Sequence, residues 1–225
     1  MTLDRIVVDV NRGASGASAP VVVLLHGFCG LATDLAPFAR SLGVAGRFVV
    51  PHGLVDLAPR GLRGRAWWPI DVDARDAAIA LGEPRDLSAF VPEGLTEARE
   101  AIGELIDELA RESPGSPVVV GGFSQGGMLS CDLALRTDHP LAAIAIFSGA
   151  RIAAEEWRPR LATRAGLRVF MSHGRADPDL SFVAAESFKE ELEGAGLRVE
   201  WCPFEGGHEI PLVALRAFKK FLKEL

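Results

Sequence analysis

The stretch that most restricts the fold runs from Pro117 to Met128 and reads PVVVGGFSQGGM. Three consecutive valines, Val118 to Val120, are typical of a strand that is buried on both faces, as the strands of parallel sheets are. Glycines follow at once, and a helix is predicted from Gln125 to about Arg136. The sequence therefore predicts a buried parallel strand that turns abruptly into a helix.

Ser124 lies at the centre of a G-x-S-x-G pattern within this turn. In such a strained turn, Gly122 and Gly126 leave room for neighbouring backbone, and the serine hydroxyl is lifted clear of the sheet edge. The amide of Gln125 then lies at the start of the helix, where main-chain N–H groups and the helix dipole can stabilise an oxyanion. The pattern alone leaves open the alternative of a glycine-rich turn whose serine has no chemical role.

Strands and helices alternate along the rest of the chain. Strands are predicted at 5–10 (an edge strand), 21–25, 47–50, 141–147, 166–171 and 198–203. Helices are predicted at 33–42 (capped at or near Thr33), 74–81, 92–111, 178–194 (after its first turn) and 211–225. Gly13 to Pro20 is predicted to be a flexible connector. This alternation, without an internal repeat, predicts one α/β domain over residues 1–225, with a doubly wound, mostly parallel sheet and helices on both faces.

Charge and apolar runs exclude several classes of protein. The net charge is -6 and the charged residues are scattered, so no basic surface for nucleic acid is expected. No apolar run approaches the roughly 20 residues that span a bilayer, and the first ten residues do not have the form of a secretory signal. A soluble cytoplasmic protein is therefore expected.

The three cysteines, Cys29, Cys131 and Cys202, lie far apart and show no spacing typical of metal ligands. Neither a disulfide framework nor a zinc site is indicated. We therefore expect no metal and no cofactor.

The predicted strand at 21–25 runs into a loop of the form H-G-x-x-G, from His26 to Gly30. In an acyl-transfer site, a loop after a central strand supplies a second N–H to the oxyanion, and the amide of Phe28 is the candidate. His26 is expected to be a structural imidazole bonded to nearby backbone. Cys29 lies in the same loop and is either a substrate contact or a small packing residue.

Residues 52–92 contain no long periodic segment, and such a span within a compact domain is usually functional or mobile. Its adjacent tryptophans, Trp67 and Trp68, are of a kind that lines a groove for an apolar substrate. We assign Trp68 to the groove and expect Trp67 to anchor the loop. This segment is therefore predicted to be an insertion that forms part of a substrate groove. Its arginines at 60, 63 and 65 are expected to be solvated.

Ser124, Asp177 and His208 each lie just beyond the end of a predicted strand, and in a doubly wound sheet these ends converge on one crevice. Serine is a poor nucleophile at its own pKa, so an imidazole must take its proton and a carboxylate must orient that imidazole. The order serine, aspartate, histidine is that of the α/β-hydrolases. These three residues are the predicted catalytic triad.

Asp179 and Glu205 are alternative carboxylates near these positions. Asp177 is preferred because it follows a strand end directly, in an H-G-x-x-D pattern. Asp179 is expected to cap the following helix, and Glu205 to be a loop residue or a neighbour of the site.

Six segments together carry a resemblance to a known family: LLHGFCG, FVVPHG, AWWPID, GGFSQGG, SHGRAD and EGGHEI. The set resembles the phospholipase/carboxylesterase group of α/β-hydrolases, which includes the acyl-protein thioesterases, and it covers nearly the whole chain. The resemblance implies a triad of Ser124, Asp177 and His208, oxyanion amides at Phe28 and Gln125, and Trp68 near the acyl groove. It also implies hydrolysis of short to medium acyl esters or thioesters without a metal.

The leading hypothesis is a serine esterase that forms an acyl-enzyme on Ser124 and acts on a small or lipid-like acyl ester. A lysophospholipase and an acyl-protein thioesterase are narrower alternatives, and a non-catalytic ligand-binding protein on the same fold is a further one. The chain departs from the family at Leu180-Ser181, where an apolar residue and a proline are frequent, and in the length of the segment from Arg60 to Pro92. Both departures concern the acyl preference. A homodimer is a candidate assembly.

Overall fold

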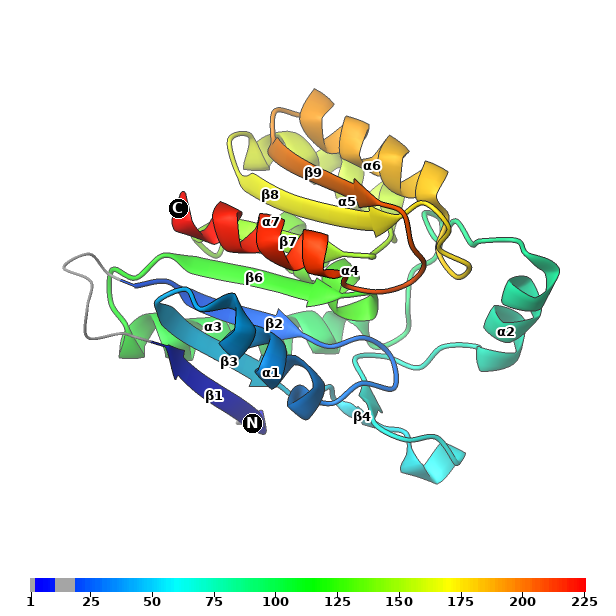
Figure 1. Ribbon diagram of the computed structural model, residues 1–225, viewed down its shortest axis with the longest axis horizontal. Coiled ribbons are helices and arrows are strands. Elements are labelled where there is room, and N and C mark those ends of the chain that lie inside the picture. The colour runs from blue at the N-terminus through cyan, green and yellow to red at the C-terminus, as the bar shows by residue number, and fades with distance from the viewer. Residues whose placement is uncertain (1–2, 11–18) are drawn as a thin grey trace.

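The computed structural model describes residues 3–10 and 19–225. A seven-stranded sheet has the order β1-β3-β2-β6-β7-β8-β9 and is parallel except at β1, which pairs antiparallel with β3 (Figure 1). Its strands are β1 (Arg5–Val10), β2 (Val21–Leu25), β3 (Gly46–Pro51), β6 (Val118–Phe123), β7 (Leu141–Phe147), β8 (Arg168–Gly174) and β9 (Arg198–Phe204). This confirms the predicted mostly parallel sheet. Most of the predicted connector, residues 13–18, lies outside the described residues.

Helices cover both faces of the sheet (Figure 1). One face carries α3 (Leu95–Glu112), α4 (Gln125–Arg136), α5 (Ala154–Leu161) and α6 (Phe182–Gly194), and the other carries α1 (Ala32–Leu42) and α7 (Leu212–Lys223). Successive side chains of a strand point to opposite faces. Val23 therefore belongs to the first apolar core, and its neighbours Val22 and Leu24 belong to the second. Burial on both sides explains why the strand sequences are continuously apolar.

One predicted helix cap lies close to its expected position, and another is wrong. The N-cap of α1 is Leu31, two residues before Thr33, because the Asp34 carboxylate accepts the Leu31 N–H at 2.7 Å. The N-cap of α6 is Ser181, whose hydroxyl accepts the N–H of Ala184. Asp179 therefore does not cap this helix.

Helix α5 has no counterpart among the predicted elements. It contains a proline, and a buried carboxylate on the neighbouring helix α4 holds it in place. Trp157 on α5 donates its Nε1–H to Asp132 Oδ1 at 2.8 Å, and Arg99 on α3 donates to Asp132 Oδ2 at 2.8 Å. Asp132 thereby joins three helices.

Residues 52–92 include β4 (Val55–Asp56), the 3₁₀ turn Ala58–Arg60, β5 (Arg65–Ala66) and α2 (Val72–Leu81). The helix predicted from residue 74 thus begins two residues earlier, and Asp71 caps it by accepting the N–H of Ala74 at 2.9 Å. Arg65 was expected to be solvated. Its guanidinium instead donates to the main-chain carbonyls of Gly53 and Leu54.

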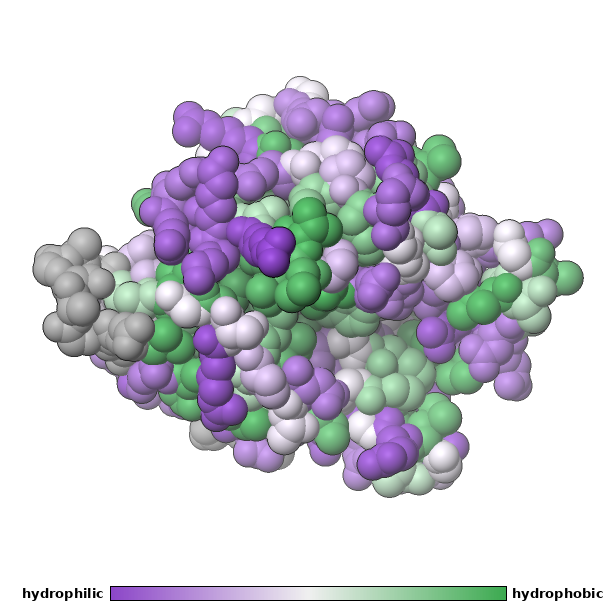
Figure 2. All heavy atoms as spheres, in the orientation of Figure 1, coloured by the Kyte–Doolittle hydropathy of each residue, from purple (hydrophilic) through white to green (hydrophobic). Residues whose placement is uncertain are grey.

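Helix α2 stands beyond the carboxyl ends of the parallel strands, apart from the helices that cover the sheet (Figure 1). None of its residues is buried. Figure 2 shows that hydrophilic and hydrophobic side chains share its outer surface at the margin of the molecule. Apolar burial therefore contributes little to its attachment. In the part of the chain that the structure describes, no helix combines the length and apolar character required to cross a membrane.

The turn after β6 lies against the end of β2 at very short distances. A Cβ atom on Gly122 would lie 2.5 Å from the carbonyl oxygen of Leu25, and one on Gly126 would collide with the same carbonyl group. Only glycine allows this approach.

His26, which is 1% exposed, holds the loop after β2. Its Nδ1 lies 2.8 Å from the Gly27 carbonyl oxygen, and its Nε2 lies 2.9 Å from the main-chain nitrogen of Gly53. Because the Gly53 N–H can only donate, Nε2 accepts and Nδ1 carries the proton. This confirms the expected structural imidazole. Burial lowers the pKa of His26.

Replacing Gly126 by alanine should reduce the free energy of unfolding by about 3 kcal/mol, because the added methyl meets rigid backbone that cannot move aside cheaply. Urea unfolding followed by circular dichroism measures the change. The matched control is Gly194→Ala at the end of α6, where nothing lies within 4 Å of the added atom. The control should be neutral or slightly stabilising. Wild-type stability of Gly126→Ala would contradict the close approach.

The free energy of unfolding should decrease as the pH is lowered, in part because of His26. Because folding lowers the pKa of this imidazole, the unfolded chain takes up the proton first. The contribution of neutral His26 is complete above the ordinary imidazole pKa of about 6.5 and is lost as the pH falls from there toward the folded-state value. Urea unfolding between about pH 7 and pH 5 should therefore show a steeper decline for the wild type than for His26→Gln. Identical slopes would argue against this role.

Candidate active site

Ser124 occupies the turn between β6 and α4 with φ 52° and ψ -116°. A positive φ is costly for a residue other than glycine and persists only where the surroundings impose it. Here the Ser124 N–H donates to the Phe147 carbonyl at 2.8 Å, and the Met128 N–H donates to the Ser124 carbonyl at 3.1 Å. The serine is thus held at the carboxyl edge of the sheet, as the G-x-S-x-G pattern predicts.

A cavity of about 260 Å³ opens beside this serine. Both Ser124 and His208 line it, and much of its wall is apolar. The remaining lining residues are Phe28, Trp68, Ile70, Asp71, Ala74, Arg75, Arg85, Leu87, Phe90, Phe123, Gln125, Met128, Asp179 and Leu180. Eight of these residues, from Trp68 to Phe90, come from the predicted 52–92 insertion.

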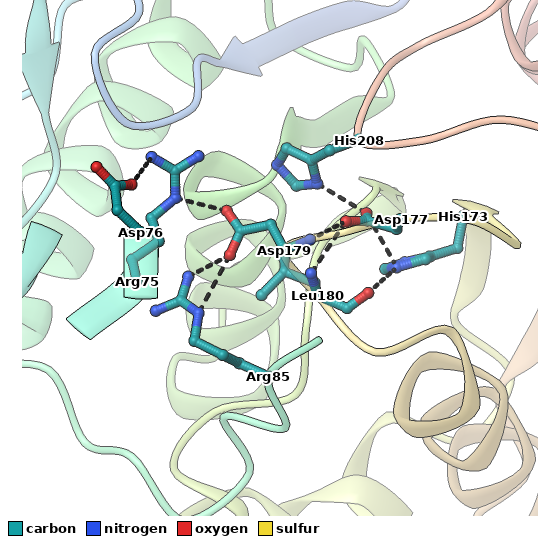
Figure 3. A network of polar contacts seen from close by, with 8 residues as sticks. All are labelled: Arg75, Asp76, Arg85, His173, Asp177, Asp179, Leu180 and His208. Carbon is teal, nitrogen blue, oxygen red and sulfur yellow. Dashed lines mark hydrogen bonds and ion pairs between the residues drawn. The ribbon is translucent and has the colours of Figure 1, made fainter. Parts of the chain in front are cut away.

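His208 and Asp177 form a hydrogen-bonded pair (Figure 3). Asp177 follows β8, and its Oδ2 lies 2.8 Å from Nδ1 of His208, which follows β9. The other oxygen, Oδ1, accepts the main-chain N–H of Asp179 at 2.9 Å and of Leu180 at 3.0 Å. The ring of His208 also packs on Phe123, with 4.8 Å between centroids. The acid and the imidazole therefore have defined orientations.

The protonation of this pair follows from its surroundings. Burial by itself would raise the pKa of Asp177, but hydrogen bonds from His173 and His208 hold that pKa well below its usual range. An ionised Asp177 can only accept, so Nδ1 of His208 donates and Nε2 keeps its lone pair. This is the tautomer that a general base acting on a serine needs. Within residues 3–10 and 19–225, no hydrogen bond joins the Ser124 hydroxyl to His208, although both line one cavity.

A second histidine contacts the acid. The Nε2 of His173, a fully buried residue of β8, lies 3.3 Å from Asp177 Oδ2 and 3.2 Å from the Leu180 carbonyl oxygen. Both partners are acceptors, so Nε2 carries the proton. The spacing of four residues between His173 and Asp177, across a strand end, is the signal that could have suggested the contact.

The two predicted oxyanion amides lie beside the serine. Phe28 and Gln125 both line the cavity, and in the described structure neither main-chain N–H makes a hydrogen bond. A Cβ atom on Gly27 would lie 3.3 Å from the Cβ of Ser124, so the loop that carries Phe28 is directly against the serine. Two N–H donors are thus left to bind a developing negative charge.

The side chain of Gln125 holds the adjacent tryptophans. Its Oε1 accepts the Trp67 N–H at 2.8 Å, and its Nε2 donates to the Trp68 carbonyl at 2.9 Å. Trp67 anchors the segment further by donating its indole N–H to the His26 carbonyl at 2.8 Å. Trp68 lines the cavity, and its role as a substrate contact stays a prediction. The side-chain role of Gln125 was not foreseen.

Cys29 and Glu205 both lie outside the cavity lining. Cys29 is exposed, so its assignment as a substrate contact is not supported. Its main-chain carbonyl instead lies against Gly64. Glu205 is an exposed residue of the loop after β9, as expected, and pairs with Arg175 at 3.1 Å. Across the described residues, no group of three or more His, Cys, Asp or Glu side chains is arranged to hold a metal ion.

Known proteins share both the sequence pattern and the fold. An acyl-protein thioesterase 1 from Neurospora crassa is 28% identical over 186 residues, which are 79% of this chain and 73% of that protein. A probable carboxylesterase from Oryza sativa subsp. japonica is 30% identical over 67% of this chain and 56% of its own length. The crystal structure of esterase PE8 superposes with a TM-score of 0.81 and 25% identity, covering 100% of this chain and 99% of that one.

The superposition agrees with the overall fold described above. The family model described as Phospholipase/Carboxylesterase matches residues 10–225, which is nearly the whole chain. The resemblance seen in the six sequence segments is confirmed. The protein belongs to the phospholipase/carboxylesterase family and has the α/β-hydrolase fold.

Proposed function

We propose that this protein hydrolyses carboxylic esters or thioesters through an acyl-enzyme on Ser124. One observation carries the proposal: the hydrogen-bonded pair of His208 and ionised Asp177 opens onto the same cavity as a serine held on a strained elbow. The names of its relatives, an acyl-protein thioesterase and a probable carboxylesterase, support the same bond types.

Each step of the reaction has a residue to perform it. Nε2 of His208 takes the proton as Ser124 Oγ attacks the acyl carbonyl carbon, and Asp177 stabilises the resulting imidazolium. The amides of Phe28 and Gln125 donate to the oxyanion of the tetrahedral intermediate. Collapse of the intermediate expels the alcohol or thiol, which receives the proton from His208. A water molecule then repeats the sequence on the acyl-enzyme and releases the acid. The contact between the serine and the imidazole forms on substrate binding, as catalytic hydrogen bonds often do.

The acyl group is proposed to lie in the apolar part of the cavity. Trp68, Ile70, Leu87, Phe90 and Met128 line this part, and the volume of about 260 Å³ suits a short to medium acyl chain. An acyl-protein thioesterase and a lysophospholipase are the narrower possibilities. Comparing kcat/KM for acetyl to palmitoyl esters of p-nitrophenol, and for one matching thioester, separates them.

A single domain, a cytoplasmic location and a homodimer are further parts of the proposal. One seven-stranded sheet includes both the first strand, β1, and the last, β9, which supports the single domain. The cysteines at 29, 131 and 202 are free thiols, as in reducing compartments, which supports the second.

Replacing Ser124 by alanine should lower kcat for p-nitrophenyl acetate by more than about a thousandfold, because the nucleophile is lost while the oxyanion donors remain. Labelling by a fluorophosphonate should disappear with it. The control is Ser187→Ala, at an exposed serine of α6 outside the cavity. Turnover by Ser124→Ala equal to that of the control would refute the acyl-enzyme.

Between about pH 5 and about pH 8, activity should increase with pH, because a general base accepts a proton only when it is neutral. Asp177 should not limit this range, since its pKa is held well below its usual value. The profile of kcat/KM for p-nitrophenyl acetate, corrected for spontaneous hydrolysis, measures the effect. A flat profile would exclude a neutral imidazole as the base.

A further inference from the structure

Asp179 is a buried carboxylate that two arginines bind, although its sequence position suggests a helix cap (Figure 3). Arg75 on α2 donates Nε–H to Asp179 Oδ2 at 2.7 Å. Arg85, in the segment after α2, donates Nε–H to Oδ1 at 3.1 Å and also binds that oxygen through Nη2. Asp179 is 4% exposed, so its charge depends on these partners rather than on water.

Main-chain bonds join the same two segments. The Arg85 N–H donates to the Asp179 carbonyl at 2.8 Å, and the Ser181 N–H donates to the Arg85 carbonyl at 3.0 Å. Arg85 thereby forms a short parallel bridge with the loop after β8. Because α2 has no buried residue, these polar contacts are a principal attachment of this cavity wall to the rest of the molecule.

The backbone of residues 179–180, which Arg75 and Arg85 anchor, also binds the Asp177 carboxylate. The Asp179 N–H donates to Asp177 Oδ1 at 2.9 Å, and the next residue, Leu180, donates to the same oxygen at 3.0 Å. The direction of the Asp177 carboxylate toward His208 therefore depends on the path of residues 179–180. The side chain and carbonyl of Asp179 hold that path against Arg75 and Arg85.

We propose that Asp179 is a positioning residue for the hydrolysis proposed above: held by Arg75 and Arg85, it fixes the turn that directs Asp177 toward His208. This role rests on the proposed function and adds a residue that never touches the reacting atoms. In this role, the same contacts of Asp179 hold one wall of the acyl cavity and orient the Asp177 carboxylate.

The chemistry of the contact requires a carboxylate. Three guanidinium N–H groups converge on two oxygens, both of which must accept. An asparagine has one acceptor oxygen, and its NH₂ group would face a second donor. Asp179→Asn therefore preserves the shape of the side chain while breaking the anchor.

The test compares Asp179→Asn with Glu191→Gln, measuring kcat and KM for p-nitrophenyl acetate, the rate of fluorophosphonate labelling of Ser124, and Tm. Glu191 is a matched control because it also accepts from two arginines, Arg151 and Arg158, and does not line the cavity. Asp179→Asn should lower kcat and the labelling rate by about tenfold to a hundredfold, with KM changed by less than about twofold. Glu191→Gln should leave all three kinetic values unchanged.

Variants at Arg85 provide a second series. Lysine keeps a positive charge beside Asp179, so Arg85→Lys should retain more of the wild-type kcat than Arg85→Gln. If Asp179→Asn does not fold, the Arg85 variants still test the positioning role of Asp179. A merely structural contact would lower Tm without producing this ranking.

Two results would overturn the positioning role: wild-type kcat and labelling rate in Asp179→Asn, whatever its Tm, or a change confined to KM, which would place the effect in the cavity wall alone. The wild type is measured first. A wild type that hydrolyses no ester and is not labelled at Ser124 refutes the proposed function itself. An active wild type with an equally active Asp179→Asn refutes only the role of Asp179.

Discussion

The backbone of the turn after β6 lies directly against the last carbonyl group of β2, and the candidate site depends on that approach. Gly122 and Gly126 permit it because any side chain there would meet the Leu25 carbonyl. With the two segments this close, α4 starts immediately after the strand, and Ser124 is left at the apex with a positive φ. The same approach brings the loop of Phe28 against the serine, so the proposed nucleophile and the proposed oxyanion donors are held by the same backbone contact. The cost of one strained residue is offset by the hydrogen bonds and burial around it.

Asp177 and His208 lie on the loops that follow two neighbouring strands, β8 and β9. Because β8 and β9 are parallel and adjacent, Asp177 and His208 leave the sheet at the same edge. Asp177 is buried, yet it stays ionised because imidazoles on two sides and the N–H groups of its own turn compensate for lost water. That charge then selects the tautomer of His208. The electrostatics of the site thus follow from strand order, since a different order would separate these two loops.

The wall of the cavity is attached by polar contacts rather than by apolar packing. Gln125 binds the main chain on both sides of the Trp67–Trp68 bond, and Asp179 binds arginines on and after α2. Such contacts are directional, so they fix the orientation of a segment that buries little surface. The residues that hold the wall, Gln125 and Asp179, are also neighbours of the nucleophile and the acid. In the proposed reaction, the attachment of the cavity wall and the positions of Ser124 and Asp177 therefore depend on the same few side chains.

The sequence by itself determined the features that depend on local patterns. Continuous apolar runs specify strands buried on both faces, and G-x-S-x-G specifies the elbow around Ser124, because both depend on residues within a few positions of one another. The triad could likewise be proposed from the positions of strand ends and from a family resemblance, as could a place for Trp68 in the substrate groove. The link between Ser124 and His208 stays a prediction. Only the tertiary structure decided what Asp179 binds, because its arginine partners lie 104 and 94 residues away along the chain. The same reason explains why α5 was not predicted, since its Trp157 binds Asp132 on α4, which lies 25 residues away along the chain. Neighbouring residues settle a turn or a strand, whereas the partner of a buried charge is known only when the chain has folded.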